Sequence, residues 1–196
     1  DPANADLMTT ASPYDGDPIN IAHMIPRSRE DLTKRREGLR RWSEQTFGLM
    51  GRSPYHVASF MAGFAGNSGV FGRAGDGFAQ NVVNFHRRVC AEDLYLSYTI
   101  VPPQIDRSKP AHQQADPHLY AGVKEERDGG IVIKGAQMLG TGMVLSNWVF
   151  LSSIVPLRPG DGKILQLVPP GETGEAPITA SPVPAAPGDA AAALPP

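Results

Sequence analysis

The chain has 196 residues, of which 41% are hydrophobic and 19% are charged, and its formal net charge is -2. This composition is sufficient for a packed core, and the near-neutral charge gives no general attraction to nucleic acid. The single cysteine, Cys90, excludes an internal disulfide and any zinc or iron–sulfur site built from several cysteines. We expect a cytoplasmic protein with no nucleic-acid partner.

Three further classes of protein are not indicated by the sequence. No apolar run is long enough to span a bilayer, and residues 1–6 lack the basic and apolar parts of a signal peptide, so no membrane partner is expected. The histidines have no acidic partners at metal-ligand spacing, which predicts no metal site. Walker, dinucleotide-binding and nucleophile-elbow motifs do not occur.

The first hundred residues are predicted to be helical after a turn-rich start over 1–26 that bends at Asp15–Pro18. The first helix covers about 28–48, with Ser28 as its N-cap. Its apolar residues recur on one face: Leu32, Leu39, Trp42 and Phe47. Basic residues occupy the other faces, which favours a solvated surface over an anion-binding one.

Two more helices follow in the prediction. Ser53 and Pro54 are typical of a helix start, because serine caps well and proline suits the first helical position. After a flexible glycine-rich connection over 66–77, a third helix is predicted from about Phe78 to Ile100. Two prolines at 102 and 103 would end it, which places Tyr98 in its last turn.

After a polar loop over 104–118 the hydrophobic period changes to two, as in strands. A hairpin is predicted from 119–126 and 131–134, and further strands over 148–155 and 164–168. Segment 169–196 is nearly all proline, alanine, glycine and small polar residues, so we expect it to be disordered. The predicted fold class is α+β, with a helical domain over 1–103, an incomplete antiparallel β domain over 104–168 and a tail over 169–196.

Three side chains are candidate catalytic residues. Arg52 lies at a glycine-flanked corner before a helix N-terminus, where a guanidinium can bind a carboxylate, phenolate or phosphate. His56 follows one turn later and can reach the same point. Tyr98 offers a hydroxyl group near the two prolines. The alternatives are a surface arginine, a packed histidine and a core tyrosine, and for Tyr98 the core reading is favoured.

Four more residues are candidates for binding a flat cofactor. Thr141 stands between two glycines, and Gly140 beside it permits a close approach to a ring, although a plain turn or bulge is the commoner explanation. Gln104 and Gln113 in the polar loop could hydrogen-bond the edge of a flavin, although loop glutamines are usually only solvated.

These motifs together resemble one known family. The segments Gly48–Pro54, Glu92–Leu94, Val101–Ser108 and Gly135–Gly142 look like the oxygenase component of 4-hydroxyphenylacetate 3-monooxygenase, in the family's order and spacing. The resemblance covers about residues 1–163. It implies an acyl-CoA dehydrogenase-like fold, present here in part: the helical domain, truncated at its start, and an incomplete β domain, with the C-terminal four-helix bundle missing.

The resemblance also implies a chemistry. It is the ortho-hydroxylation of a 4-hydroxyphenylacetate-like phenol with dioxygen and reduced FAD, which a separate NAD(P)H-flavin reductase supplies to a homotetramer. Arg52 matches the arginine that faces the phenol, and Gln104 and Thr141 match positions that line the flavin. His56 and Tyr98 stand where the family often has tyrosine and histidine, so the two residue types are exchanged.

Two alternatives follow from departures from the family pattern. Family members are more than twice as long, and the tail replaces expected strand sequence after Lys163. A non-catalytic remnant without a complete flavin site is therefore the alternative function, and the chain alone is expected to be inactive. A dehydratase-type relative is set aside, because its iron–sulfur cluster needs several cysteines.

Overall fold

The computed structural model describes residues 2–49, 53, 55–73, 75–116, 118–127, 130–138, 140–152 and 165–168. The chain divides into two compact units, Asp1–Leu96 and Ser97–Pro196. The domain boundaries expected after residues 103 and 168 stay predictions, and the predicted tail lies outside the described residues. Within the described ranges, no helix has the length and apolar character needed to cross a membrane.

The first unit begins with short elements. A 3-10 turn η1 (Pro2–Asn4) and helix α1 (Ala5–Met8) precede a hairpin of β1 (Thr9–Ala11) and β2 (Pro18–Asn20). The predicted bend is confirmed, because Gly16 turns the chain there with φ +84°, a conformation that favours glycine. The 3-10 turn η2 (Ile21–His23) follows, and the side chain of Asn20 caps it by accepting from the N–H of Ala22.

Helix α2 (Arg29–Gln45) starts where the sequence predicts. Ser28 Oγ accepts from the N–H of Asp31, and the Asp31 carboxylate accepts from the N–H of Ser28, which forms a capping box. The helix ends before Gly48, which has φ +69° and donates its N–H to the carbonyl of Ser43 at 2.9 Å. The predicted helix over about 28–48 is thus confirmed, and it ends a few residues earlier than predicted.

The face of α2 that packs differs from the apolar stripe in the sequence. Leu32 is 57% exposed and Phe47 is 88% exposed, whereas Gly38 is buried. A methyl group on Gly38 would lie 2.9 Å from Tyr55 Oη and 3.1 Å from Ile21 Cγ2. The backbone of α2 therefore packs against the core at Gly38, and the apolar stripe seen in the sequence does not form this contact.

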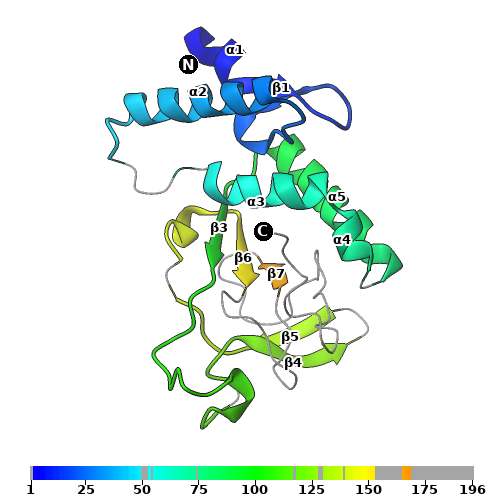
Figure 1. Ribbon diagram of the computed structural model, residues 1–196, viewed down its shortest axis with the longest axis vertical. Coiled ribbons are helices and arrows are strands. Elements are labelled where there is room, and N and C mark those ends of the chain that lie inside the picture. The colour runs from blue at the N-terminus through cyan, green and yellow to red at the C-terminus, as the bar shows by residue number, and fades with distance from the viewer. Residues whose placement is uncertain are drawn as a thin grey trace. The chain divides into compact units, whose positions relative to one another are not determined.

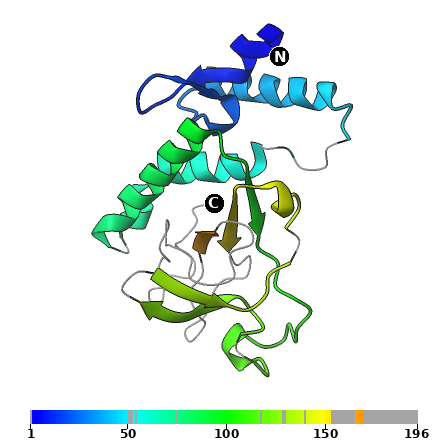
Figure 2. The same ribbon diagram turned by 180° about the vertical axis from the view of Figure 1, so that it is seen from behind.

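Helices α3 (Tyr55–Gly66) and α5 (Asp76–Glu92) pack side by side, as both ribbon views show (Figures 1 and 2). The core residues of these helices are mostly apolar: Val57, Ala58, Met61, Ala62, Val82, Phe85 and Val89. The glycine-rich connection between them was predicted to be irregular, but it contains the one-turn helix α4 (Gly69–Gly72). Phe71 of α4 is buried against Phe64 of α3, with ring centroids 5.3 Å apart.

The predicted third helix is wrong over its last eight residues. Helix α5 ends at Glu92, because Asp93 adopts the left-handed conformation with φ +46° and Leu94 N–H bonds back to the carbonyl of Val89. The chain then forms strand β3 (Leu96–Thr99). Tyr98 is thus a strand residue, since Tyr98 and Thr99 have side chains that favour strands and neighbouring strands are available to pair.

The second unit is built from strands. β3, β6 (Trp148–Ser152) and β7 (Leu165–Val168) form one sheet in the order β3-β6-β7, and β6 pairs antiparallel with β7. β4 (Gly122–Arg127) and β5 (Gly130–Lys134) form the predicted antiparallel hairpin, with a register shift between Val123 and Glu125. The strand predictions are confirmed over the described residues, apart from a later start for β4, while predicted strand residues 153–155 and 164 lie outside the described residues (Figure 1).

Candidate functional site

The Gly140–Thr141–Gly142 segment forms a tight corner. Gly142 has φ +75°, and the 3-10 turn η4 (Met143–Leu145) starts directly after it. Backbone N–H groups of Met143 and Leu145 donate to the carbonyls of Gly140 and Gly142, each at 3.0 Å. The Thr141 side chain is exposed and has no hydrogen-bond partner among the described residues. The corner therefore presents an exposed hydroxyl group between two residues without side chains.

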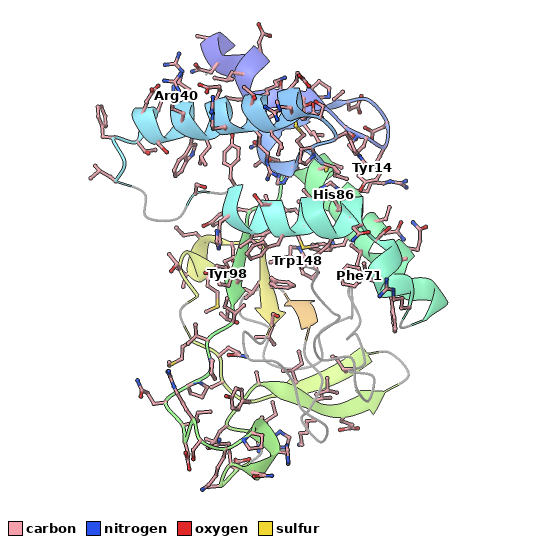
Figure 3. The ribbon with its side chains drawn as sticks, viewed as in Figure 1. Tyr14, Arg40, Phe71, His86, Tyr98 and Trp148 are labelled. Atoms are coloured by element: carbon pink, nitrogen blue, oxygen red, sulfur yellow. The ribbon has the colours of Figure 1, made fainter. Side chains whose placement is uncertain are left out.

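The corner adjoins the strand that carries Tyr98. The N–H of Met138 donates to the carbonyl of Val101 at 2.7 Å, which pairs the two segments antiparallel. Tyr98 is half-buried on β3, and Trp148 is buried on the neighbouring β6 (Figure 3). Of the sequence-predicted residues, Tyr98 and the Gly140–Thr141 pair are thus brought into one neighbourhood.

The two glutamines have different settings. Gln104 is exposed, three residues after the Val101–Met138 pairing. Gln113 is exposed on the 3-10 turn η3 (Ala111–Gln113), and its Nε2 lies 3.3 Å from Nε2 of His112. In both ribbon views η3 lies at the opposite end of this unit from η4 (Figures 1 and 2).

Gln114 is the glutamine that organises the polar loop, and the sequence analysis missed it. Its side chain is 9% exposed, and its Nε2 donates to the carbonyls of Asp106 at 2.7 Å and Lys109 at 3.0 Å. Hydrogen bonds from Ser108 and Lys109 lower the pKa of Asp106 to about 2. Gln114 differs from Gln113 in its burial and in these two hydrogen bonds. Both depend on how the loop folds, so the sequence carries no signal that separates the two glutamines.

The remaining candidates belong to the first unit. His56 is half-buried in the first turn of α3, and its ring centroid lies 5.0 Å from that of Phe60. Its N–H donates to the carbonyl of Ser53, which confirms the predicted helix start. Arg52 lies outside the described residues. The candidate residues are thus divided between the two units.

A buried polar cluster in the first unit was not predicted. His86 on α5 is fully buried, and its Nε2 donates to the carbonyl of His23 at 3.0 Å. Its Nδ1 must then accept from the Tyr14 hydroxyl at 2.7 Å (Figure 3). Burial lowers the pKa of His86 to about 4 and raises that of Cys90 to about 12. The imidazole is neutral and the thiol is protonated, so Cys90 is not a nucleophile.

His23 forms a second pair in the same region. Its Nε2 donates to Oδ1 of Asp93 at 3.0 Å, and this bond lowers the pKa of the Asp93 carboxyl. The pair joins η2 to the left-handed end of α5, so its role is structural. The helical spacing of His86 and Cys90, four residues apart, was the one sequence signal for this cluster. Among the described residues, no group of three or more acidic, histidine or cysteine side chains could hold a metal ion.

Known proteins match most of the length of this chain. The oxygenase component of 4-hydroxyphenylacetate 3-monooxygenase from Thermus thermophilus is 32% identical over 163 residues, 83% of this chain and 32% of the relative. The oxygenase component of 4-nitrophenol 2-monooxygenase from a Rhodococcus species is 32% identical over 76% of this chain and 27% of the relative. The chain therefore spans about a third or less of the length of these relatives.

A crystal structure of a 4-hydroxyphenylacetate 3-monooxygenase oxygenase component complexed with FAD and 4-hydroxyphenylacetate superposes with a TM-score of 0.74 at 28% identity, over 86% of this chain and 34% of that one. The α+β, acyl-CoA dehydrogenase-like fold class is thereby confirmed. The chain belongs to the 4-hydroxyphenylacetate 3-hydroxylase N-terminal family, whose model matches residues 1–168.

Proposed function

We propose that this chain forms the N-terminal part of an oxygenase component that hydroxylates a phenol beside its hydroxyl group, using reduced FAD and dioxygen. The observation that carries the proposal is its similarity to a structure complexed with both FAD and a phenol. The curated relatives support it, because those named above are oxygenase components of phenol monooxygenases.

The second unit supplies the cofactor contacts in this proposal. The exposed hydroxyl of Thr141 and the uncovered backbone at Gly140 suit the polar edge and flat face of a flavin. Gln104 is a further contact, and Gln113 has no support from the geometry. Bound reduced FAD supplies the chemistry with dioxygen, while the protein orients it and keeps water away.

The substrate contacts come from Arg52, His56 and Tyr98. A guanidinium at Arg52 would attract the phenolate form of the substrate, whose ring is the more electron-rich. His56 and Tyr98 are the groups that would accept or share the phenol proton. A 4-hydroxyphenylacetate-like phenol fits this set, because its phenolate oxygen would meet the cation and its hydroxyl proton would pass to His56 or Tyr98.

The test is a chimaera in which residues 1–168 replace the matching part of the Thermus thermophilus relative. With chemically reduced FAD, ¹⁸O₂ and 4-hydroxyphenylacetate, we expect a catechol that carries one ¹⁸O atom, while the second oxygen atom leaves as water and the flavin is oxidised. The unaltered relative is the positive control. A chimaera that folds, binds FAD and yields no catechol from any phenol would refute the proposal.

A further inference from the structure

Strand β3 contacts the Gly140–Ser146 loop at two points through buried side chains. Ser97 and Thr99 are two positions apart and share one face of the strand, and they are 2% and 5% exposed. Thr99 backs the start of the loop, because a methyl group on Gly140 would lie 3.0 Å from Thr99 Cγ2. Ser97 meets the end of the loop, where its Oγ lies 2.9 Å from Oγ of Ser146.

The direction of the serine–serine hydrogen bond follows from the other bond that Ser146 makes. Ser146 Oγ donates to the carbonyl of Met143 at 2.8 Å, and a serine hydroxyl has one proton to donate. Ser97 is therefore the donor to Ser146. Two hydrogen bonds thus run in series from β3 through Ser146 to the backbone of η4.

These two bonds fix the loop that carries Thr141. Ser146 is 8% exposed, so its hydroxyl has little water to replace a lost partner. The N–H of Ser146 also donates to Met143 at 3.1 Å, which closes the end of η4. Thr141 lies between the two points that β3 holds, and its own side chain is exposed. The corner is therefore fixed from the buried side and open on the other.

We propose that Ser97 and Ser146 are positioning residues for the flavin. Their paired hydroxyl groups hold the Gly140–Ser146 loop in one conformation, so that Thr141 meets the flavin edge already oriented. The inference rests on the proposed function, since it requires this corner to contact FAD. A contact that is ordered before binding saves the entropy of ordering it at the moment of binding, which tightens the complex.

The first test needs no flavin. Backbone amide hydrogen exchange of residues 140–146 is measured in the unaltered chain and in Ser146→Ala, Ser97→Ala and Ser146→Thr. We expect about tenfold faster exchange in Ser146→Ala, the effect of losing a buried hydrogen bond. Ser97→Ala should have a smaller effect, because Ser146 keeps its bond to Met143. Ser146→Thr keeps the hydroxyl and should exchange like the unaltered chain.

The second test is calorimetric titration of the same variants, now introduced into the chimaera, with reduced FAD under nitrogen. We expect the Kd for FAD to rise about tenfold in Ser146→Ala, less in Ser97→Ala, and to recover in Ser146→Thr. Ser12→Ala is the matched control, because Ser12 is 7% exposed in the first unit and its Oγ accepts from the N–H of Tyr14. It should lower the melting temperature and leave the Kd unchanged.

The outcomes separate the two proposals. A serine variant that loosens the loop, or lowers the melting temperature, without changing the Kd for FAD would overturn the positioning role alone. Unchanged exchange in Ser146→Ala would overturn it as well. An unaltered chimaera that protects the loop but does not bind reduced FAD would refute the assignment of these flavin contacts, and the positioning role with it.

Discussion

His86 shows how much a single buried side chain depends on its surroundings. Both ring nitrogens have hydrogen-bond partners, from the β1–β2 turn and from η2, which fixes a neutral tautomer. Burial lowers the pKa of His86 most, and the cation Arg35, which donates to the carbonyl of Ala22 at 2.9 Å, lowers it further. The hydrogen bond to the His23 carbonyl raises the pKa of His86, but the effect of burial is larger.

The pH dependence of stability should reflect this burial. The pKa of His86 is about 4 in the folded chain and 6.5 when unperturbed, so between these values the unfolded chain binds more protons. The free energy of unfolding should fall as the pH falls from 6.5 to 4, by at most about 1.4 kcal/mol per pH unit from this group. Urea unfolding in His86→Gln should show a shallower dependence.

His112→Gln is the control for that experiment, because His112 is exposed on η3 in the other unit. It should leave the pH dependence unchanged. An equally steep dependence in His86→Gln would assign the effect to another group.

Arg52 carries the proposed contact with the phenol. In the chimaera, Arg52→Ala should raise the KM for 4-hydroxyphenylacetate by about tenfold or more, the cost of one charge-assisted hydrogen bond, while the Kd for reduced FAD changes little. Arg52→Lys should recover only part of the loss, because lysine keeps the positive charge but lacks the planar guanidinium group. Steady-state kinetics that show the same KM in Arg52→Ala would remove Arg52 from the site.

At the scale of elements, α2 illustrates why a capping signal is more reliable than an apolar stripe. Caps are formed by neighbours in the sequence, and the Ser28–Asp31 box depends on nothing else. Which face of a helix is buried depends on the residues that pack against it. Here Ile21 and Tyr55 come so close to α2 that only a glycine fits at position 38. β3 makes the same point, because a left-handed Asp93 and available partner strands end a predicted helix early.

Two glycine substitutions distinguish packing from helix propensity. Gly38→Ala should destabilise the chain by about 1–3 kcal/mol, because the added methyl group meets Tyr55 Oη and Ile21 Cγ2. Gly63→Ala in α3 is the matched control, since nothing lies within 4 Å of the added methyl group, and it should stabilise by up to about 1 kcal/mol. Thermal unfolding measures both, and equal effects would contradict the close approach at Gly38.

At the scale of the whole molecule, the residues named in the proposal are divided between the two units. His56 lies in the first, and Tyr98, Gln104 and Thr141 lie in the second. The relatives are about three to four times as long as the matched region. A reaction that excludes water and holds two ligands needs a closed site, so we assign the proposed activity to a chain of the relatives' length, such as the chimaera.

The chain alone should therefore turn over little or no phenol under the conditions in which the chimaera is active. The measurement is catechol product per mole of protein at equal concentrations of reduced FAD. The unaltered relative and a chimaera with Arg52→Ala are the upper and lower references. Turnover by the chain alone that equals the chimaera would show that these residues suffice.

Local chemistry was enough for the sequence to determine the capped start of α2, the start of α3, the β4–β5 hairpin, the glycine corner and the family. Each of these elements depends on residues a few positions apart, and the family on several such short motifs in one order. The tertiary structure decided that Tyr98 lies on a strand, that Gly38 is the packing face of α2, that His86 is neutral, and that Ser97 meets Ser146. Those features join residues between 17 and 72 positions apart, and burial by distant neighbours is not encoded in any short motif.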